Sequence, residues 1–193
     1  MKRLLSLVLI SLSMLGTAYA GGADNKAEGG VKWMSLDEAQ AAMQREPKKV
    51  LIDMYTDWCG WCKVMDRKTF SNPEVAAYIN KNFYAVKFNA ESRDSVRFGG
   101  RMWGISEGNR ANDLAVELLK GQLSYPTTVI MEAGFQNPQP VPGYLDVPTM
   151  EVILHYLGED VYKQKVPFVE YQKDYKHQWT AAKEEKQPAN AGH

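Results

Sequence analysis

The chain has 193 residues, of which 45% are hydrophobic and 24% charged, and its formal net charge is zero. This length is sufficient for one domain with a sizeable core plus extensions. The balanced charge argues against nucleic acid and against an anionic membrane surface as partners, since both attract strongly basic proteins.

The first twenty residues have the pattern of a secretory signal peptide. Lys2 and Arg3 precede an apolar run, and residues 18–20 (Ala-Tyr-Ala) form a small-x-small cleavage site. The run is shorter than the roughly 20 residues that span a bilayer, which favours cleavage over an uncleaved anchor. We therefore expect an exported protein with no stable membrane insertion after cleavage, in which residues 21–30 are a flexible lead-in.

Helices and strands are predicted to alternate in the first half of the chain. A capping box at residues 35–38 (Ser-Leu-Asp-Glu) predicts a helix to about residue 45. The apolar run 50–55 is typical of a central strand covered on both faces. Cys59 follows it at the start of a helical stretch, and after that come a helix that begins at Asn72-Pro73 and a strand over 83–89.

The second half completes an α/β pattern. It predicts a hairpin over 96–103, a helix over 111–120, strands over 127–131 and 141–145, and a helix from Asp146 to Gly158. This order predicts a central mixed sheet flanked by helices, with an antiparallel strand pair at its end. Residues 159–180 predict a C-terminal helical extension, and the polar residues 181–193 predict a disordered tail.

The chain has two cysteines, Cys59 and Cys62, and they are three positions apart. A bridge across two residues closes almost no loop and adds little stability, so a redox role is better motivated than a structural one. A metal site is the alternative, but two sulfurs do not complete a tetrahedral zinc shell. The histidines, at positions 155, 177 and 193, are not near the pair in sequence, and we expect no metal.

The pair lies in the motif Cys59-Gly60-Trp61-Cys62 at a predicted strand-to-helix turn. Only a thiolate is nucleophilic, and a helix N-terminus favours the charged form of Cys59. The spacing lets Cys62 reach Cys59 from one turn later, and Gly60 is expected to let the backbone turn without an obstructing side chain. Trp58 and Trp61 flank the pair, so we expect both to be partly exposed and to bind substrates.

The residues around this motif resemble the active-site region of the thioredoxin superfamily. Residues 51–63 carry the resemblance, and the continuation at 69–75 (Thr-Phe-Ser-Asn-Pro-Glu-Val) is most similar to the C-terminal thioredoxin-like domain of the periplasmic disulfide reductase DsbD. The resemblance covers roughly residues 31–158. Further matching positions are Asp53, Lys87, the cis-proline loop Tyr125-Pro126-Thr127 and Gly143 of the last strand.

The resemblance implies a thioredoxin-like domain at 31–158, with an insertion at about 91–121 before the cis-proline. It also implies roles for the cysteines and for one carboxylate. Cys59 would attack a substrate disulfide, and Cys62, the more buried of the two, would resolve the mixed disulfide. Burial would raise the pKa of Asp53, which could then accept the Cys62 proton.

Other residues would have supporting roles. Lys87 would lie near Asp53, and a purely structural ion pair between the two is the alternative to a role in proton transfer. Tyr125 and Pro126 would face the sulfurs and pair with an extended substrate chain. Trp61 replaces the proline of thioredoxin and has a backbone N–H that proline lacks. That N–H predicts an extra hydrogen bond to Cys59 and a less reducing potential than thioredoxin's.

The leading functional hypothesis, which follows from the resemblance to DsbD, is a periplasmic reductase or electron relay for disulfides in other proteins. It would take electrons from a membrane thiol donor and would need no cofactor beyond the Cys59–Cys62 pair. An oxidase or isomerase that introduces or reshuffles disulfides is the alternative, since fold alone does not set direction. A non-catalytic peptide-binding module is a third possibility, against which the intact cysteine pair argues.

Overall fold

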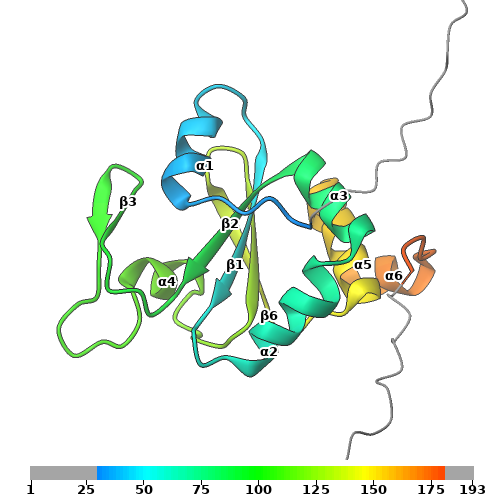
Figure 1. The fold of residues 1–193 in the computed structure, drawn as a ribbon. Helices are drawn as coiled ribbons and strands as arrows, with labels where there is room; N and C mark the ends of the chain where they lie inside the picture. Colours follow the sequence, from blue (N-terminus) through cyan, green and yellow to red (C-terminus); the bar gives the residue numbers. More distant parts are fainter. Residues whose placement is uncertain (1–29, 181–193) are drawn as a thin grey trace, which may run out of the picture.

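A computed structural model of the protein describes residues 30–180 (Figure 1). Its centre is a four-stranded sheet in the order β2-β1-β5-β6. Strand β1 (Lys49–Tyr55) pairs in parallel with β2 (Phe83–Asn89) and antiparallel with β5 (Thr127–Glu132). Strand β6 (Gln136–Pro142) then pairs antiparallel with β5 at the edge. This mixed sheet with an antiparallel end confirms the predicted fold class.

Helices cover both faces of the sheet. One face packs against α1 (Leu36–Met43) and α4 (Asp113–Leu118), and the other against α2 (Gly60–Met65), α3 (Pro73–Asn82) and α5 (Val147–Gly158). Along β1, Ile52 points to the first face and Leu51 to the second. Because side chains alternate along a strand, Asp53 shares the face of Leu51 and therefore lies on the side of α2.

Polar caps fix the starts of the three longest helices, as the sequence predicts. The Ser35 hydroxyl accepts from the Glu38 N–H at 3.2 Å, and the Glu38 carboxylate accepts from the Ser35 N–H at 2.7 Å. Asn72 caps α3, which begins at Pro73. Asp146 caps α5 by accepting a hydrogen bond from the Thr149 N–H. Each cap satisfies backbone N–H groups that have no partner inside the helix.

Two local features surround the site region. Helix α2 continues directly into a π-helical turn, η1 (Asp66–Phe70), which leads to α3. Between β2 and β5 the chain forms the predicted hairpin, with strands β3 (Val96–Phe98) and β4 (Arg101–Trp103), and then α4. Gly99 and Gly100 make the hairpin turn at φ +59° and +80°, a region that glycine adopts without strain.

The prediction for the last strand was wrong in position. The expected strand covers residues 141–145, whereas β6 ends at Pro142, and Gly143 follows it at φ +98°. Alternate residues of β6 are prolines (138, 140 and 142), which concealed the strand pattern. An edge strand accepts them because the nitrogens of alternate residues point to the same side, here away from β5.

The C-terminal extension contains two separate helical pieces. It contains a 3₁₀ turn, η2 (Val161–Gln164), and a separate helix, α6 (Phe168–Asp174). Asp160 and Lys165 flank η2 with a backbone φ of 60° each, which interrupts a continuous helix. The predicted signal peptide, all but the last residue of the lead-in and the predicted tail lie outside the described residues. Within residues 30–180, no helix combines the length and apolar character needed to cross a membrane.

Candidate active site

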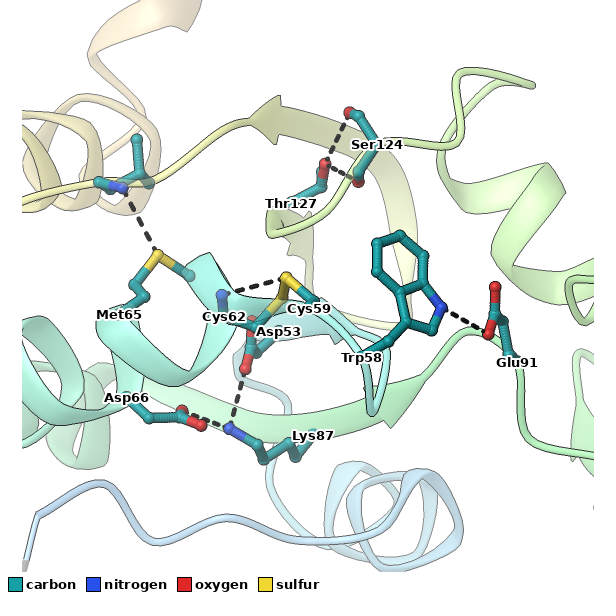
Figure 2. Close-up of a disulfide and its surroundings, with 11 residues drawn as sticks. Asp53, Trp58, Cys59, Cys62, Met65, Asp66, Lys87, Glu91, Ser124 and Thr127 are labelled. Atoms are coloured by element: carbon teal, nitrogen blue, oxygen red, sulfur yellow. Dashed lines mark hydrogen bonds and ion pairs between the residues drawn. A yellow bond between two sulfur atoms is a disulfide. The ribbon is translucent and has the colours of Figure 1, made fainter.

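Cys59 and Cys62 form a disulfide where β1 leads into α2 (Figure 2). Their Cα atoms are 5.4 Å apart, a separation typical of disulfides. Cys59 is the N-cap residue of α2, and its Sγ accepts a hydrogen bond from the Cys62 N–H at 3.1 Å. The turn therefore places one sulfur at the helix start and the other one turn later. No group of three or more potential metal ligands occurs among residues 30–180.

One expectation about the cysteines was wrong in detail. Cys62 is not more buried than Cys59, since each residue is only 3% exposed in the disulfide form. In this form the Cys59 sulfur accepts from the Cys62 N–H, and the hydrogen bond expected from the Trp61 N–H to the Cys59 thiolate of the reduced form stays a prediction. Both cysteines are held in the disulfide, so burial alone does not tell the attacking sulfur from the resolving one.

The expected steric role of Gly60 was also wrong. Its φ lies outside the left-handed region, and a Cβ built on it would meet no atom within 4 Å. The turn into α2 therefore does not require glycine at this position. No side chain covers the surface at Gly60, next to the disulfide.

Two exposed tryptophans flank the buried disulfide, as predicted. Trp58 is 67% exposed and Trp61 is 61% exposed. The Trp58 indole N–H donates to Glu91 at 2.8 Å (Figure 2). The centroid of its ring lies 6.0 Å from that of Tyr125, in an edge-to-face arrangement. The centroid of the Trp61 ring lies 5.3 Å from the centroid of the Tyr144 ring. These contacts hold two large apolar surfaces in place beside the sulfurs.

The loop before β5 has the cis bond that the resemblance implies. The Tyr125–Pro126 peptide bond is cis, and the Pro126 carbonyl accepts from the Gly143 N–H at 2.8 Å. The residues on either side of this pair, Ser124 and Thr127, lie near the disulfide in Figure 2. The Thr127 hydroxyl donates to the Ser124 carbonyl at 2.8 Å. Within the described chain, the buried Tyr125 hydroxyl has no hydrogen-bond partner.

A charged triad lies beneath the disulfide (Figure 2). The Lys87 ammonium is 3.0 Å from Oδ2 of Asp53 and forms a second ion pair with Asp66. Asp53 is 1% exposed, and its other oxygen, Oδ1, has no hydrogen-bond partner among residues 30–180. The ion pair named above as the structural alternative therefore exists, but it engages only one of the two Asp53 oxygens.

The environment of the triad shifts two pKa values. Burial raises the pKa of Asp53 to about 6, against the opposing attraction of Lys87. Burial acts to lower the pKa of Lys87, but the Asp53 and Asp66 carboxylates outweigh it, so that this pKa is raised. Asp53 can therefore exchange a proton close to neutral pH while Lys87 stays charged.

Replacing Asp53 with asparagine should change how stability depends on pH. Between about pH 4 and pH 6 the Asp53 carboxyl ionises in the unfolded chain but stays protonated in the folded one. The free energy of unfolding therefore falls as pH rises through this window. A shift from 3.8 to about 6 corresponds to about 3 kcal/mol. Urea denaturation at pH 4 and pH 7 should show this loss in the wild type, and Asp53→Asn should lack it. Equal losses in both proteins would contradict the assignment.

Sequence reasoning missed three residues of the site: Asp66, Glu91 and Tyr144. Asp66 could have been found, because it follows Cys62 by four positions and so shares its helical face. Glu91 and Tyr144 reach the two tryptophans from distant parts of the chain. No local pattern in the sequence marks either contact.

The fold, the disulfide at a helix start, the cis-proline loop and the buried carboxylate define a class. These features are those of thioredoxin-fold thiol–disulfide oxidoreductases, to which the chain is similar. A family profile described as Thioredox_DsbH, protein of unknown function, DUF255, matches residues 19–99.

Curated relatives carry the name thiol:disulfide interchange protein DsbD. The one from Salmonella typhi is 29% identical over 158 residues, which cover 79% of this chain and 25% of the relative. The one from Cronobacter sakazakii is 32% identical over 122 residues, covering 62% of this chain and 18% of the relative. The chain thus spans about a quarter or less of these relatives. A solved structure titled DsbH Oxidoreductase has a TM-score of 0.50 at 15% identity, covering 77% of this chain and 95% of that one, and supports the fold alone.

Proposed function

We propose that the protein is a periplasmic disulfide reductase that passes electrons from a membrane thiol donor to disulfides in other proteins. The observation that carries this proposal is the Cys59–Cys62 disulfide, placed at the start of α2 between two exposed tryptophans. The signal-peptide pattern of residues 1–20 supports export. The relatives' printed name, thiol:disulfide interchange protein, supports electron exchange between proteins.

The geometry supports a two-step exchange in the reduced protein. The Cys59 thiolate attacks one sulfur of a substrate disulfide, so that a mixed disulfide forms and the other substrate sulfur leaves as a thiolate. Cys62 then attacks the Cys59 sulfur and releases the second substrate thiolate. Two electrons pass to the substrate, and the Cys59–Cys62 disulfide remains. A membrane dithiol returns the pair to the reduced form by the reverse sequence.

Asp53 is the proton acceptor in the second step. Cys62 must lose its proton before it can attack, and a buried thiol needs a nearby base for this. The unpartnered Oδ1 of Asp53 and the raised pKa of this carboxyl suit that role at neutral pH. Lys87 holds the carboxylate in position through Oδ2.

Insulin reduction tests the activity. With dithiothreitol as electron source, the protein should accelerate precipitation of the insulin B chain well above the rate with dithiothreitol alone. A rate equal to the uncatalysed one would contradict the proposal.

The direction of electron flow needs a measurement in cells. Alkylation of free thiols in rapidly acidified cells reports the redox state of the Cys59–Cys62 pair. A pair that is mostly reduced supports a reductase. A pair that is mostly oxidised would contradict a reductase and indicate an oxidase.

A further inference from the structure

A hollow of about 820 Å³ lies beside the active site, with Trp58 as one of its walls. Its other walls come from the segment between β2 and α4 and include Glu91, Arg93, Ser95, Asn109 and Arg110. Trp58 directly precedes Cys59, and Figure 2 shows its ring between the disulfide and Glu91. A chain bound at the sulfurs can therefore extend into this hollow.

The hollow presents two arginines that form no ion pair with a carboxylate of the described residues. Among residues 30–180, neither Arg93 nor Arg110 forms a salt bridge or a side-chain hydrogen bond. The one acidic wall residue, Glu91, accepts the Trp58 indole N–H. Two free guanidinium groups in one concave surface are suited to a carboxylate, which a guanidinium can hold through paired hydrogen bonds.

The acidic groups nearby have neutral partners. Asp113 accepts from the Ser106 hydroxyl and from the Asn109 side chain at 3.2 Å. The Ser92 hydroxyl donates to the Asp94 carboxylate at 3.5 Å and accepts from the Asp94 N–H at 3.2 Å. Arg101, the other arginine close in sequence, stacks on Trp103, with its guanidinium carbon 3.4 Å from the ring centroid. Among the residues that line the hollow, Arg93 and Arg110 outnumber Glu91, so its walls carry an excess of one positive charge.

We propose that this hollow is a specificity subsite for acidic side chains next to the target cystine of a protein substrate. The inference rests on the proposed function. An extended chain advances about 3.3 Å per residue, so an Asp or Glu about two to four residues from the attacked cysteine would reach past Trp58. Arg93 and Arg110 bind its carboxylate, and Trp58 packs against the intervening chain. The subsite selects substrates and takes no part in the sulfur exchange.

Matched cystine peptides test the selectivity. One peptide carries Glu at the second and third positions from its cysteine, and the other carries Gln at the same two positions. Wild-type protein should reduce the acidic peptide with the higher kcat/KM, by about threefold for each arginine at low salt, because exposed ion pairs are individually weak. Salt at 0.5 M should diminish the preference, since it screens exposed charges. Equal kcat/KM values for the two peptides would overturn the proposal.

Variants assign the preference to the hollow. The double variant Arg93→Ala/Arg110→Ala should bring the ratio of acidic to neutral kcat/KM close to one. Arg97→Ala is the matched control, because Arg97 lies in the same segment but does not line the hollow, and it should keep the wild-type ratio. Arg93→Glu/Arg110→Glu should reverse the preference towards a peptide with Lys at the Glu positions. A double alanine variant that folds and retains the acidic preference would overturn the assignment.

A binding measurement separates this proposal from the proposed function. A fluorescently labelled acidic peptide, with serine in place of cysteine, should bind the wild-type protein more tightly than its Gln counterpart in fluorescence anisotropy. The subsite proposal survives a failure of disulfide reduction if this difference is present and is lost in Arg93→Ala/Arg110→Ala. Equal binding of the two peptides would overturn it even if the protein reduces insulin.

Discussion

Cys59→Ser should abolish disulfide reduction, with a loss on the order of 10³-fold or more in the insulin assay. A serine hydroxyl stays protonated at neutral pH and does not displace a thiolate from a disulfide. The fold should survive, because Cys59 is the N-cap of α2 and serine is among the preferred residues at this position. Circular dichroism and urea denaturation check that the variant is folded. Activity above a few per cent of the wild-type value would remove Cys59 as the nucleophile.

Cys62→Ala provides the matched comparison. It keeps the attacking sulfur but removes the resolving one, so mixed disulfides with partner proteins should accumulate on a non-reducing gel and disappear with dithiothreitol. Both cysteines are equally buried in the disulfide form, so burial does not tell which sulfur attacks, and this comparison decides it. If Cys59→Ala captured as many partners as Cys62→Ala, the assignment of the two roles would be wrong.

Local patterns in the sequence predict most of the fold. The caps at Ser35, Asn72 and Asp146 are short-range signals, and each marks the helix start that the structure has. The continuous apolar run of β1 is also a short-range signal, and it predicts a buried central strand. Strand β6 was misplaced because its prolines are tolerated only at a sheet edge, and edge position is a property of the whole sheet.

The site was predictable only in part. The cysteine pair was found from its motif spacing, and Asp53 and Lys87 were found from the resemblance to thioredoxins. In the structure the parallel β1–β2 register pairs Asp53 with Lys87. Glu91 and Tyr144 were missed because they meet the tryptophans through loops whose course no periodicity encodes. The lack of any steric need for glycine at position 60 is likewise visible only in three dimensions.

No pattern in the sequence indicates the buried carboxylate of Glu151, which lies outside the site. Glu151 lies on α5 among apolar residues and is 0% exposed. Its carboxylate accepts from the backbone N–H groups of Gln178 and Trp179, at 2.7 and 3.2 Å, and from the Tyr175 hydroxyl at 3.3 Å. The His177 ring nitrogen lies 3.2 Å from its other oxygen. These partners follow 24 to 28 residues later, in a segment without regular structure after α6.

Glu151 therefore fixes the C-terminal segment to the body of the protein. The segment is also held at its end, where the Thr180 N–H donates to Glu74 at 2.8 Å and the Thr180 carbonyl accepts from Asn72 at 2.9 Å. The centroid of the Trp179 ring lies 5.4 Å from the centroid of the Tyr78 ring on α3. Of these contacts, the Glu151 carboxylate alone gathers several donors in a fully buried position, where hydrogen bonds contribute most.

Glu151→Ala should lower the free energy of unfolding by about 2–4 kcal/mol, because the donors around the carboxylate would be left buried without an acceptor or the segment would detach. Urea denaturation measures the loss, and hydrogen exchange at Gln178 and Trp179 should become faster than in the wild type. Glu151→Gln, which keeps one acceptor oxygen, should lose less. Glu170→Ala on the exposed side of α6 is the control and should stay within about 0.5 kcal/mol of the wild type.

The same variant separates stability from catalysis. Glu151 lies on α5, and none of its hydrogen-bond partners belongs to the disulfide region. Glu151→Ala should therefore reduce insulin at the wild-type rate at temperatures where it is fully folded. A fully folded Glu151→Ala protein with unchanged protection at Gln178 and Trp179 would show that Thr180 and Trp179 hold the segment without the carboxylate.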